Sequence, residues 1–168
     1  MMSFQQDWKA VAWAGIIAGS VFLALEMFMV PVFGGGSPWG PPRMMAAIAL
    51  GKGVLPPPAT FDFGIVMAAM SLHLMLSVVY AAVFALAVSR LSLGPALALG
   101  AIGGMVLYVV NFYGFTALFP WFAMARNWIS IVGHVVFGLV AAGAYVAISE
   151  HHIRRESLVR VTLREEKA

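Results

Sequence analysis

The sequence contains no cysteine and very few charged residues, and both deficits narrow the class of protein. Without cysteine the chain has neither disulfide bonds nor thiolate ligands for a metal. Charged residues make up 10% of the chain, whereas a soluble globular domain has about 25%. Hydrophobic residues make up 62% of the 168 residues, and one core of this size cannot bury so much apolar surface. We therefore predict that lipid is the solvent for most of the chain.

The sequence also lacks the patterns on which common enzymes and nucleic-acid-binding proteins depend. It has no nucleophile with a base, no glycine-rich phosphate loop and no paired carboxylates. The basic residues that give the net charge of +3 lie at the predicted membrane edges, and no fold signature for reading bases is visible. The sequence therefore gives no support for catalysis or for nucleic-acid binding.

Four apolar segments are long enough to cross a membrane as helices, which needs about 20 residues. Glycine and proline separate these segments, and the longest connection is a Gly- and Pro-rich loop. The segments run roughly over residues 10–33, 63–89, 96–119 and 127–149. The sequence thus predicts an all-α polytopic membrane protein whose four-transmembrane-helix bundle occupies residues 10–149.

The placement of lysine and arginine predicts the orientation of this bundle. Residues 1–9, the connection at Arg90 and the tail at 150–168 hold most of the basic residues. Because basic residues accumulate on the cytoplasmic side, we predict that both termini are cytoplasmic and that 150–168 is a basic cytoplasmic tail. Trp39 and Trp121 then lie in the outer loops, where tryptophan suits the membrane interface.

The two halves of the bundle, about 10–90 and 95–149, repeat a weak pattern. Two spans restore the starting orientation, so a duplication predicts two parallel two-helix repeats. Chance agreement among glycine-rich helices is the alternative. The matched pairs are Gly15 with Gly100, Gly19 with Gly104, Glu26 with Asn111, Trp39 with Trp121, Arg43 with Arg126, and His73 with His134.

Three short stretches resemble the YagU-like group of small bacterial inner-membrane proteins. They lie at 15–19 (Gly-Ile-Ile-Ala-Gly), 73–80 (His-Leu-Met-Leu-Ser-Val-Val-Tyr) and 132–134 (Val-Gly-His). The layout is also similar, with Gly-rich odd helices and a histidine early in each even helix. The resemblance covers roughly residues 15–148 and implies this fold in a bacterial inner membrane. It implies no activity and no cofactor.

Four polar residues lie at a similar predicted depth, in the outer half of the membrane. An ionisable side chain at the centre of a membrane helix costs about 2.5–3.5 kcal/mol to insert, so such residues face the bundle interior and pair with one another. Ser77 and Tyr80 lie on the same helix face as one of the four and could extend the network. The four residues are Glu26, His73, Asn111 and His134. We predict that they converge on one buried site.

Several roles fit this set of residues. Two imidazoles, a carboxylate and an amide oxygen could together bind a divalent metal ion. His73 and His134 could instead be axial ligands of haem b, although Glu26 and Asn111 would then place polar groups against the macrocycle. Glu26 and the histidines could relay protons. Alternatively, the polar residues only hold helices together in a non-catalytic accessory or scaffold subunit.

The predicted outer loops carry two arginines and two tryptophans. Arg43 and Arg126 fit anchors at lipid headgroups, together with Trp39 and Trp121, or a guard at an outer mouth above the polar site. If haem were bound, the arginines could meet its propionates. Membrane lipids are the one partner that the composition requires. The lipid-facing apolar residues are compatible with a monomer, a homo-oligomer or a larger membrane complex.

Overall fold

A computed structural model of the chain describes residues 6–165, without the side chains of 156–162, 164 and 165. Every regular element among these residues is a helix, and four of the helices are long and apolar enough to cross a membrane. The four are α1 (Trp8–Gly34), α3 (Phe63–Val88), α4 (Leu93–Val109), which short turns extend to Ala117, and α5 (Trp128–Glu165). The predicted all-α, four-helix membrane bundle is confirmed.

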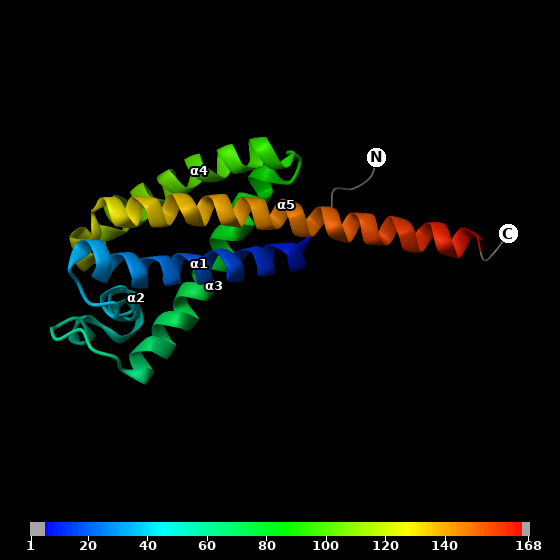
Figure 1. Cartoon of the computed structure of the whole chain (residues 1–168). Coiled ribbons are helices and arrows are strands. Elements are labelled where there is room, and N and C mark those ends of the chain that lie inside the picture. Colours follow the sequence, from blue (N-terminus) through cyan, green and yellow to red (C-terminus); the bar gives the residue numbers. More distant parts are fainter. Residues whose placement is uncertain (1–5, 166–168) are drawn as a thin grey trace.

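The four helices do not form a regular bundle. α1, α4 and α5 run side by side, whereas α3 crosses them obliquely and diverges at one end (Figure 1). α2 (Gly40–Leu50) packs against the diverging part of α3. We call this end, which also holds the short helix η4 (Pro120–Ala125), the loop end. The terminal end is the opposite one, where α1 begins and α5 projects.

Local signals explain where the helices begin and end. Asp7 and Asp62 precede α1 and α3, and each side chain accepts a hydrogen bond of 2.9 Å from the backbone N–H three residues further on. Asn127 caps α5 in the same way at 3.1 Å. Gly35 ends α1 in the left-handed conformation, with φ at 64°, which glycine adopts without steric cost. Local signals therefore mark the start of three of the four spans and the end of α1.

Glycines allow α4 and α5 to approach until their backbones touch. A Cβ atom at Gly100 would lie 2.5 Å from the carbonyl oxygen of Gly138. A Cβ atom at Gly104 would overlap the carbonyl group of His134. Such contacts between small residues drive the packing of membrane helices, because lipid offers no hydrophobic force between them. The position of His134 is thus fixed by a glycine on the neighbouring helix.

The α1–α3 pair repeats this kind of contact. A Cβ atom at Gly15 would lie 2.6 Å from Cα of Val78, and one at Gly19 would lie 2.5 Å from Oγ of Ser77. In each half, the two glycines of the first span pack against the second span, on the turns at and just after its histidine. The shared contact agrees with the predicted duplication.

The core at the terminal end is packed from small apolar residues around one tyrosine. Its members are Ala10, Val11, Ala14, Ala85, Val88, Ala96, Ala142, Tyr145 and Val146. Six of these residues have no measurable exposed surface. This core fills the bundle at the terminal end, so a cavity at the loop end does not continue through the molecule.

The structure differs from the sequence-based prediction in the first loop, at the end of the third span and in the length of α5. The loop predicted at 34–62 contains α2 and the short helix η1 (Lys52–Val54). The third span, predicted to run to 119, changes at Val109 into the π-helical turn η2 (Val110–Gly114) and then η3 (Phe115–Ala117).

α5 does not end near 149 but continues to Glu165. Its 38 residues span about 57 Å at about 1.5 Å per residue, far more than the roughly 30 Å of a hydrocarbon core. The described part of the predicted tail is therefore a helix that projects from the terminal end (Figure 1). Residues 166–168 of the tail and 1–5 of the predicted N-terminal segment lie outside the described residues.

One contact ties the start of α1 to the projecting part of α5. Oδ2 of Asp7 lies 2.6 Å from Nδ1 of His152, while Oδ1 of Asp7 caps α1 through Ala10. Burial alone would raise the pKa of Asp7. The hydrogen bond from the Ala10 N–H and the contact with His152 outweigh burial and hold this pKa below its ordinary value of 3.8.

We expect Asp7→Asn to lower the free energy of unfolding at neutral pH by about 0.5–1 kcal/mol more than Asp62→Asn, because the pair is partly exposed. Both variants keep a capping oxygen, but only the first weakens a contact with His152. Because the folded pKa of Asp7 is lowered, its contribution is present above pH 3.8 and is lost as the pH falls through the lowered pKa. Thermal melts at neutral and acid pH measure this difference. Equal losses for the two variants at neutral pH would contradict it.

Candidate functional site

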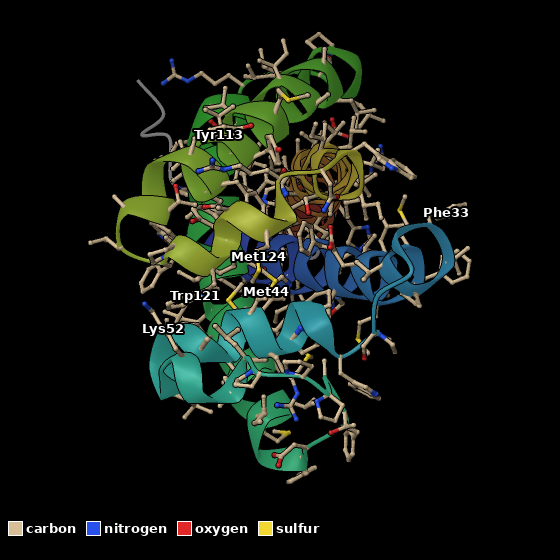
Figure 2. The ribbon with its side chains drawn as sticks, turned by 90° about the vertical axis from the view of Figure 1, so that its left-hand side faces the viewer. Phe33, Met44, Lys52, Tyr113, Trp121 and Met124 are labelled. Atoms are coloured by element: carbon tan, nitrogen blue, oxygen red, sulfur yellow. The ribbon has the colours of Figure 1, made fainter. Side chains whose placement is uncertain are left out.

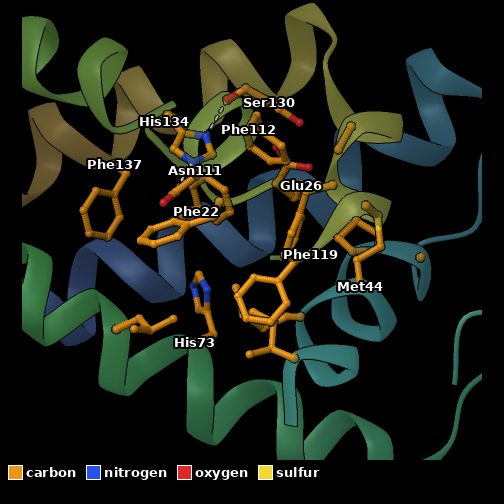
Figure 3. Close-up of a pocket in the computed structure, with 18 of the residues that line it drawn as sticks. Phe22, Glu26, Met44, His73, Asn111, Phe112, Phe119, Ser130, His134 and Phe137 are labelled. Atoms are coloured by element: carbon orange, nitrogen blue, oxygen red, sulfur yellow. Dashed lines mark hydrogen bonds between the residues drawn. The ribbon is translucent and has the colours of Figure 1, made fainter. Parts of the chain in front are cut away.

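A pocket of about 450 Å³ lies at the loop end (Figure 3). Its volume is within the range of roughly 300–1,000 Å³ that is usual for small-molecule sites. All four spans contribute to it, together with α2 and the segments around η4. Its polar lining includes the predicted residues Glu26, His73, Asn111 and His134, and also Ser77 and Tyr80. The structure therefore brings the predicted polar set to one cavity.

The pocket is lined by the four spans, and α2 and the segments around η4 form its cover at the loop end. Figure 2 views this end directly, with Met44 of α2 facing Trp121 and Met124 of η4. The Trp121 indole donates a hydrogen bond of 3.0 Å to the carbonyl oxygen of Met44 and so joins the two covering segments. The Trp39 ring packs on Phe61 with centroids 5.0 Å apart. Trp39 and Trp121, which were predicted to lie at the membrane interface, therefore pack within the segments of the loop end and stabilise them.

Most of the pocket wall is apolar, and much of it is aromatic. Rings come from three of the spans and from the cover. They belong to Phe22, Phe112, Phe115, Phe119, Phe122 and Phe137. Mostly apolar walls with a few convergent polar groups are typical of a ligand-binding cavity.

His73 is held by the backbone of the first helix. Its Nε2 atom lies 2.9 Å from the carbonyl oxygen of Gly19, so Nε2 carries the proton and donates it. The bond joins α3 to α1 at the point where the glycine permits close approach. In this position His73 acts as an interhelical hydrogen bond.

Asn111 and His134 belong to a chain of hydrogen bonds across three helices. The Tyr80 hydroxyl donates to Oδ1 of Asn111 at 2.9 Å, and Nδ2 of Asn111 donates to Nε2 of His134 at 3.2 Å. Nδ1 of His134 donates to the Ser130 carbonyl oxygen at 2.7 Å. This pattern places the proton of a neutral imidazole on Nδ1. Both ring nitrogens of His134 therefore have partners.

Asn111 lies in the π-helical turn η2, which directs its side chain toward Tyr80 and His134. A π turn inserts one extra residue per turn and re-aims the side chains within it, often at functional sites. Its five residues include Asn111 and the pocket-lining Phe112. The guanidinium of Arg126 lies 4.4 Å from the Tyr113 ring of the same turn. The turn is thus supported from the loop side.

The ring of Phe22 lies between the two histidines (Figure 3). Its centroid is 5.5 Å from that of His73 and 5.0 Å from that of His134. Among the described residues, no group of three or more histidines and acids could hold a metal ion together. The predicted metal site of Glu26, His73, Asn111 and His134 is therefore not formed.

The haem b arrangement is not formed either. An iron with two axial histidines needs a free ring nitrogen from each of them and open space between them. Phe22 occupies that space, and both nitrogens of His134 already have hydrogen-bond partners. His73 and His134 instead make two separate interhelical contacts, which give the predicted axial pair no support.

Glu26 differs from the other three predicted residues. Its side chain is 6% exposed, and Oε1 is buried without a hydrogen-bond partner in the described part of the chain. A Cβ atom at Gly133 would lie 2.8 Å from this oxygen, so the missing side chain of Gly133 leaves room for the carboxyl group. Sequence reasoning led us to expect pairing among the polar residues, and the Oε1 atom departs from that expectation.

The two outer arginines do not line the pocket. Arg43 donates to the carbonyl oxygens of Thr60 and Val54 at 3.0 and 2.8 Å, and Arg126 donates to that of Phe112 at 2.7 Å. Each arginine thereby fixes the backbone of its own half of the loop end. The predicted guard at an outer mouth is replaced by a structural tie, while headgroup anchoring stays a prediction.

Sequence reasoning missed Phe22 and Gly133. Phe22 lies one helical turn before Glu26, on the same face, and this spacing was the available signal. Gly133 stands directly before His134 in the sequence. Neither residue type stands out in a membrane helix, where phenylalanine and glycine are both common.

Comparisons with known proteins leave the site to be interpreted from its own residues. No protein-family model, no curated protein and no solved structure matches the chain. The resemblance to the YagU-like group therefore stays a prediction from three short stretches.

We expect Gly133→Ala to destabilise the protein through Glu26. The added methyl group would displace the carboxyl group or the Phe22 ring, whose Cε2 atom would be 3.1 Å away, and overpacking of this kind costs about 1–3 kcal/mol. In the Glu26→Ala background part of the crowding is relieved. A double-mutant cycle of unfolding free energies should therefore give a coupling of about 1 kcal/mol. Simple additivity would show that the carboxyl group lies elsewhere.

Proposed function

We propose that the chain is a small integral membrane protein that binds a small, largely apolar molecule with one polar end. The pocket at the loop end is the binding site, and Glu26 makes the polar contact. One observation carries the proposal, namely the buried Oε1 atom of Glu26 without a partner in a mostly apolar cavity. Such an atom costs about 1–3 kcal/mol. A ligand with a hydrogen-bond donor at one end would remove that cost.

The other polar residues of the pocket act as supports in this proposal. His73 joins α3 to α1, and the chain from Tyr80 through Asn111 to His134 joins α3, η2 and α5. These bonds hold the diverging helix at the distance that keeps the cavity open. A site works best when such hydrogen bonds fix its walls in advance.

A scaffold or accessory role is the second candidate. It is favoured by the same interhelical bonds of His73, Asn111 and His134, because such bonds stabilise membrane bundles by about 0.6 kcal/mol each. It leaves Glu26 unexplained, since the Oε1 atom of that residue joins no helices. The binding role requires a Glu26 carboxyl group that is free to meet a ligand, whereas the scaffold role requires one that joins helices.

A proton relay across the membrane has less support. The described core between the pocket and the terminal end consists of alanine, valine, two phenylalanines and one tyrosine. A relay would need a chain of polar groups or water through this region. The pocket supports binding from the loop end instead.

Binding of matched neutral probes tests the proposal. Naphthylmethanol offers one O–H donor on an apolar ring system, and its methyl ether offers none. With the protein in lipid nanodiscs, we expect saturable binding of the alcohol, about two- to tenfold tighter than that of the ether, because a hydrogen bond contributes about 0.5–1.5 kcal/mol net. Glu26→Leu should remove this preference. Glu150→Leu, which changes an exposed acid at the terminal end, should keep it.

The result that would overturn the proposal is equally plain. If neither probe binds saturably above empty nanodiscs, while circular dichroism shows the helical fold intact, the pocket is not a binding site. The scaffold role would then be the better account of the polar residues.

A further inference from the structure

The carboxyl group of Glu26 has no lysine or arginine beside it in the described part of the pocket lining. Both ring nitrogens of His134 are engaged, and Nε2 of His73 donates to the Gly19 carbonyl oxygen. An ionised carboxylate in an apolar cavity is stable only with a counter-charge. That charge has to come from the ligand.

The walls around this carboxyl group suit a cation as well. The rings of six phenylalanines line the same cavity, and that of Tyr80 does so as well. The face of an aromatic ring attracts a cation, most strongly where water is excluded, and quaternary ammonium groups are the usual guests of such aromatic sites. An anion would meet the carboxylate and the negative faces of these rings and would be repelled.

The position of the cavity limits how a cation could enter. The core at the terminal end closes one route, and the arginines at the loop end are held against backbone carbonyl groups outside the pocket lining. Met44 and Met124, which are apolar and polarisable, line the pocket at the loop end (Figure 2). A ligand that passes these residues must itself be largely apolar.

We infer that the pocket binds a lipophilic cation, an organic ammonium group attached to one or two rings, with its charge at Glu26 and its rings among the phenylalanines. This inference rests on the proposed function, since it names the class of ligand for the same pocket. The polar and titratable residues that line the cavity together with Glu26 are Ser37, His73, Ser77, Tyr80, Asn111, Asn127, Ser130 and His134.

A cation and a proton would compete for the same carboxylate oxygen atoms. Binding of a ligand with a permanent charge should therefore strengthen as the pH rises, because fewer protons then occupy Glu26. A neutral ligand of the same shape should show the smaller dependence. This competition distinguishes a charge at the carboxylate from burial of a ring alone.

The test uses the full chain in nanodiscs with (naphthylmethyl)trimethylammonium and neopentylnaphthalene, which differ only in a nitrogen cation and a carbon atom. We expect the cation to bind at least about tenfold more tightly than its carbon analogue. Glu26→Gln keeps the shape of the side chain and should abolish both this preference and the pH dependence of cation binding. Glu150→Gln, at the terminal end, should leave both unchanged.

The outcomes separate this inference from the proposed function. If naphthylmethanol binds saturably but the cation binds no better than its carbon analogue, the cation inference is wrong and the neutral pocket stands. If the preference for the cation survives Glu26→Gln, the charge lies elsewhere and the inference is again wrong. If none of the probes binds saturably to the folded protein, the proposed function and the inference fail together.

Discussion

Replacing Glu26 by leucine is expected to raise the free energy of unfolding of the ligand-free protein by about 1–3 kcal/mol, because it removes a buried polar atom that has no partner. Leucine fits an apolar cavity and leaves no hydrogen bond broken. His134→Leu is the matched comparison, since it removes hydrogen bonds to Asn111 and to the Ser130 carbonyl oxygen. We expect that variant to be less stable than the wild type. Thermal unfolding of both variants in nanodiscs measures the two signs.

The expected changes in unfolding free energy have opposite signs for Glu26→Leu and His134→Leu, and this difference separates a binding role from a structural one. A group kept for function often lowers stability, and its removal then stabilises the fold. If Glu26 were interhelical glue, Glu26→Leu and His134→Leu would both lower the unfolding temperature. A loss of stability in Glu26→Leu comparable to that in His134→Leu would therefore contradict a binding role for the carboxyl group.

Replacing Gly104 by leucine is expected to cost about 3 kcal/mol, at the upper end of the usual penalty for overpacking. A side chain there would overlap the backbone carbonyl group of His134, and backbone cannot move aside as a flexible side chain can. α4 and α5 would have to separate, which would also displace His134 from Asn111. We therefore expect both lower stability and weaker probe binding.

Gly94 provides a control on the same helix. A Cβ atom at Gly94 would have no neighbour within 4 Å, so Gly94→Leu should change the unfolding free energy by no more than about 0.5 kcal/mol. Unfolding in mixed micelles of increasing denaturing detergent, followed by circular dichroism, compares the two variants. Similar losses at Gly94 and Gly104 would contradict the close α4–α5 contact.

The four spans could be predicted because their signal is long and simple. Around 20 apolar residues bounded by glycine, proline or a capping carboxylate leave few alternatives to a membrane helix. α2 could not be found in the same way, because its 11 residues open with Gly40, Pro41 and Pro42 in a loop rich in helix breakers. The π turn at Val110–Gly114 also left no trace in hydropathy, because one extra residue in a turn does not alter the composition.

The polar residues of the site could be named from the sequence, but their partners could not. Insertion of Glu26 or His73 into a membrane is costly whatever surrounds it, so the residue type alone indicates an interior face. The partners depend on how each helix is rotated and on the divergence of α3, which packing between helices decides. Phe22 illustrates this limit, because an ordinary apolar residue separates two histidines that the sequence placed in one coordination sphere.

The side of the membrane on which each end of the bundle lies remains a prediction from the lysine and arginine bias. Packing defines the loop end and the terminal end of the molecule but does not relate either to a compartment. Location in a bacterial inner membrane and association with further subunits also stay predictions, because packing within one chain indicates neither the membrane nor the partners.

Chemical modification of Glu26 tests most directly whether the pocket is a site that a small molecule can enter. Dicyclohexylcarbodiimide, a lipid-soluble reagent, modifies carboxyl groups in apolar surroundings, and mass spectrometry locates the product. We predict that Glu26 is modified in the free protein and that naphthylmethanol protects it with the same concentration dependence as its binding. Modification of Glu26 at an equal rate with and without the saturating probe, or no modification of Glu26 at all, would contradict the account.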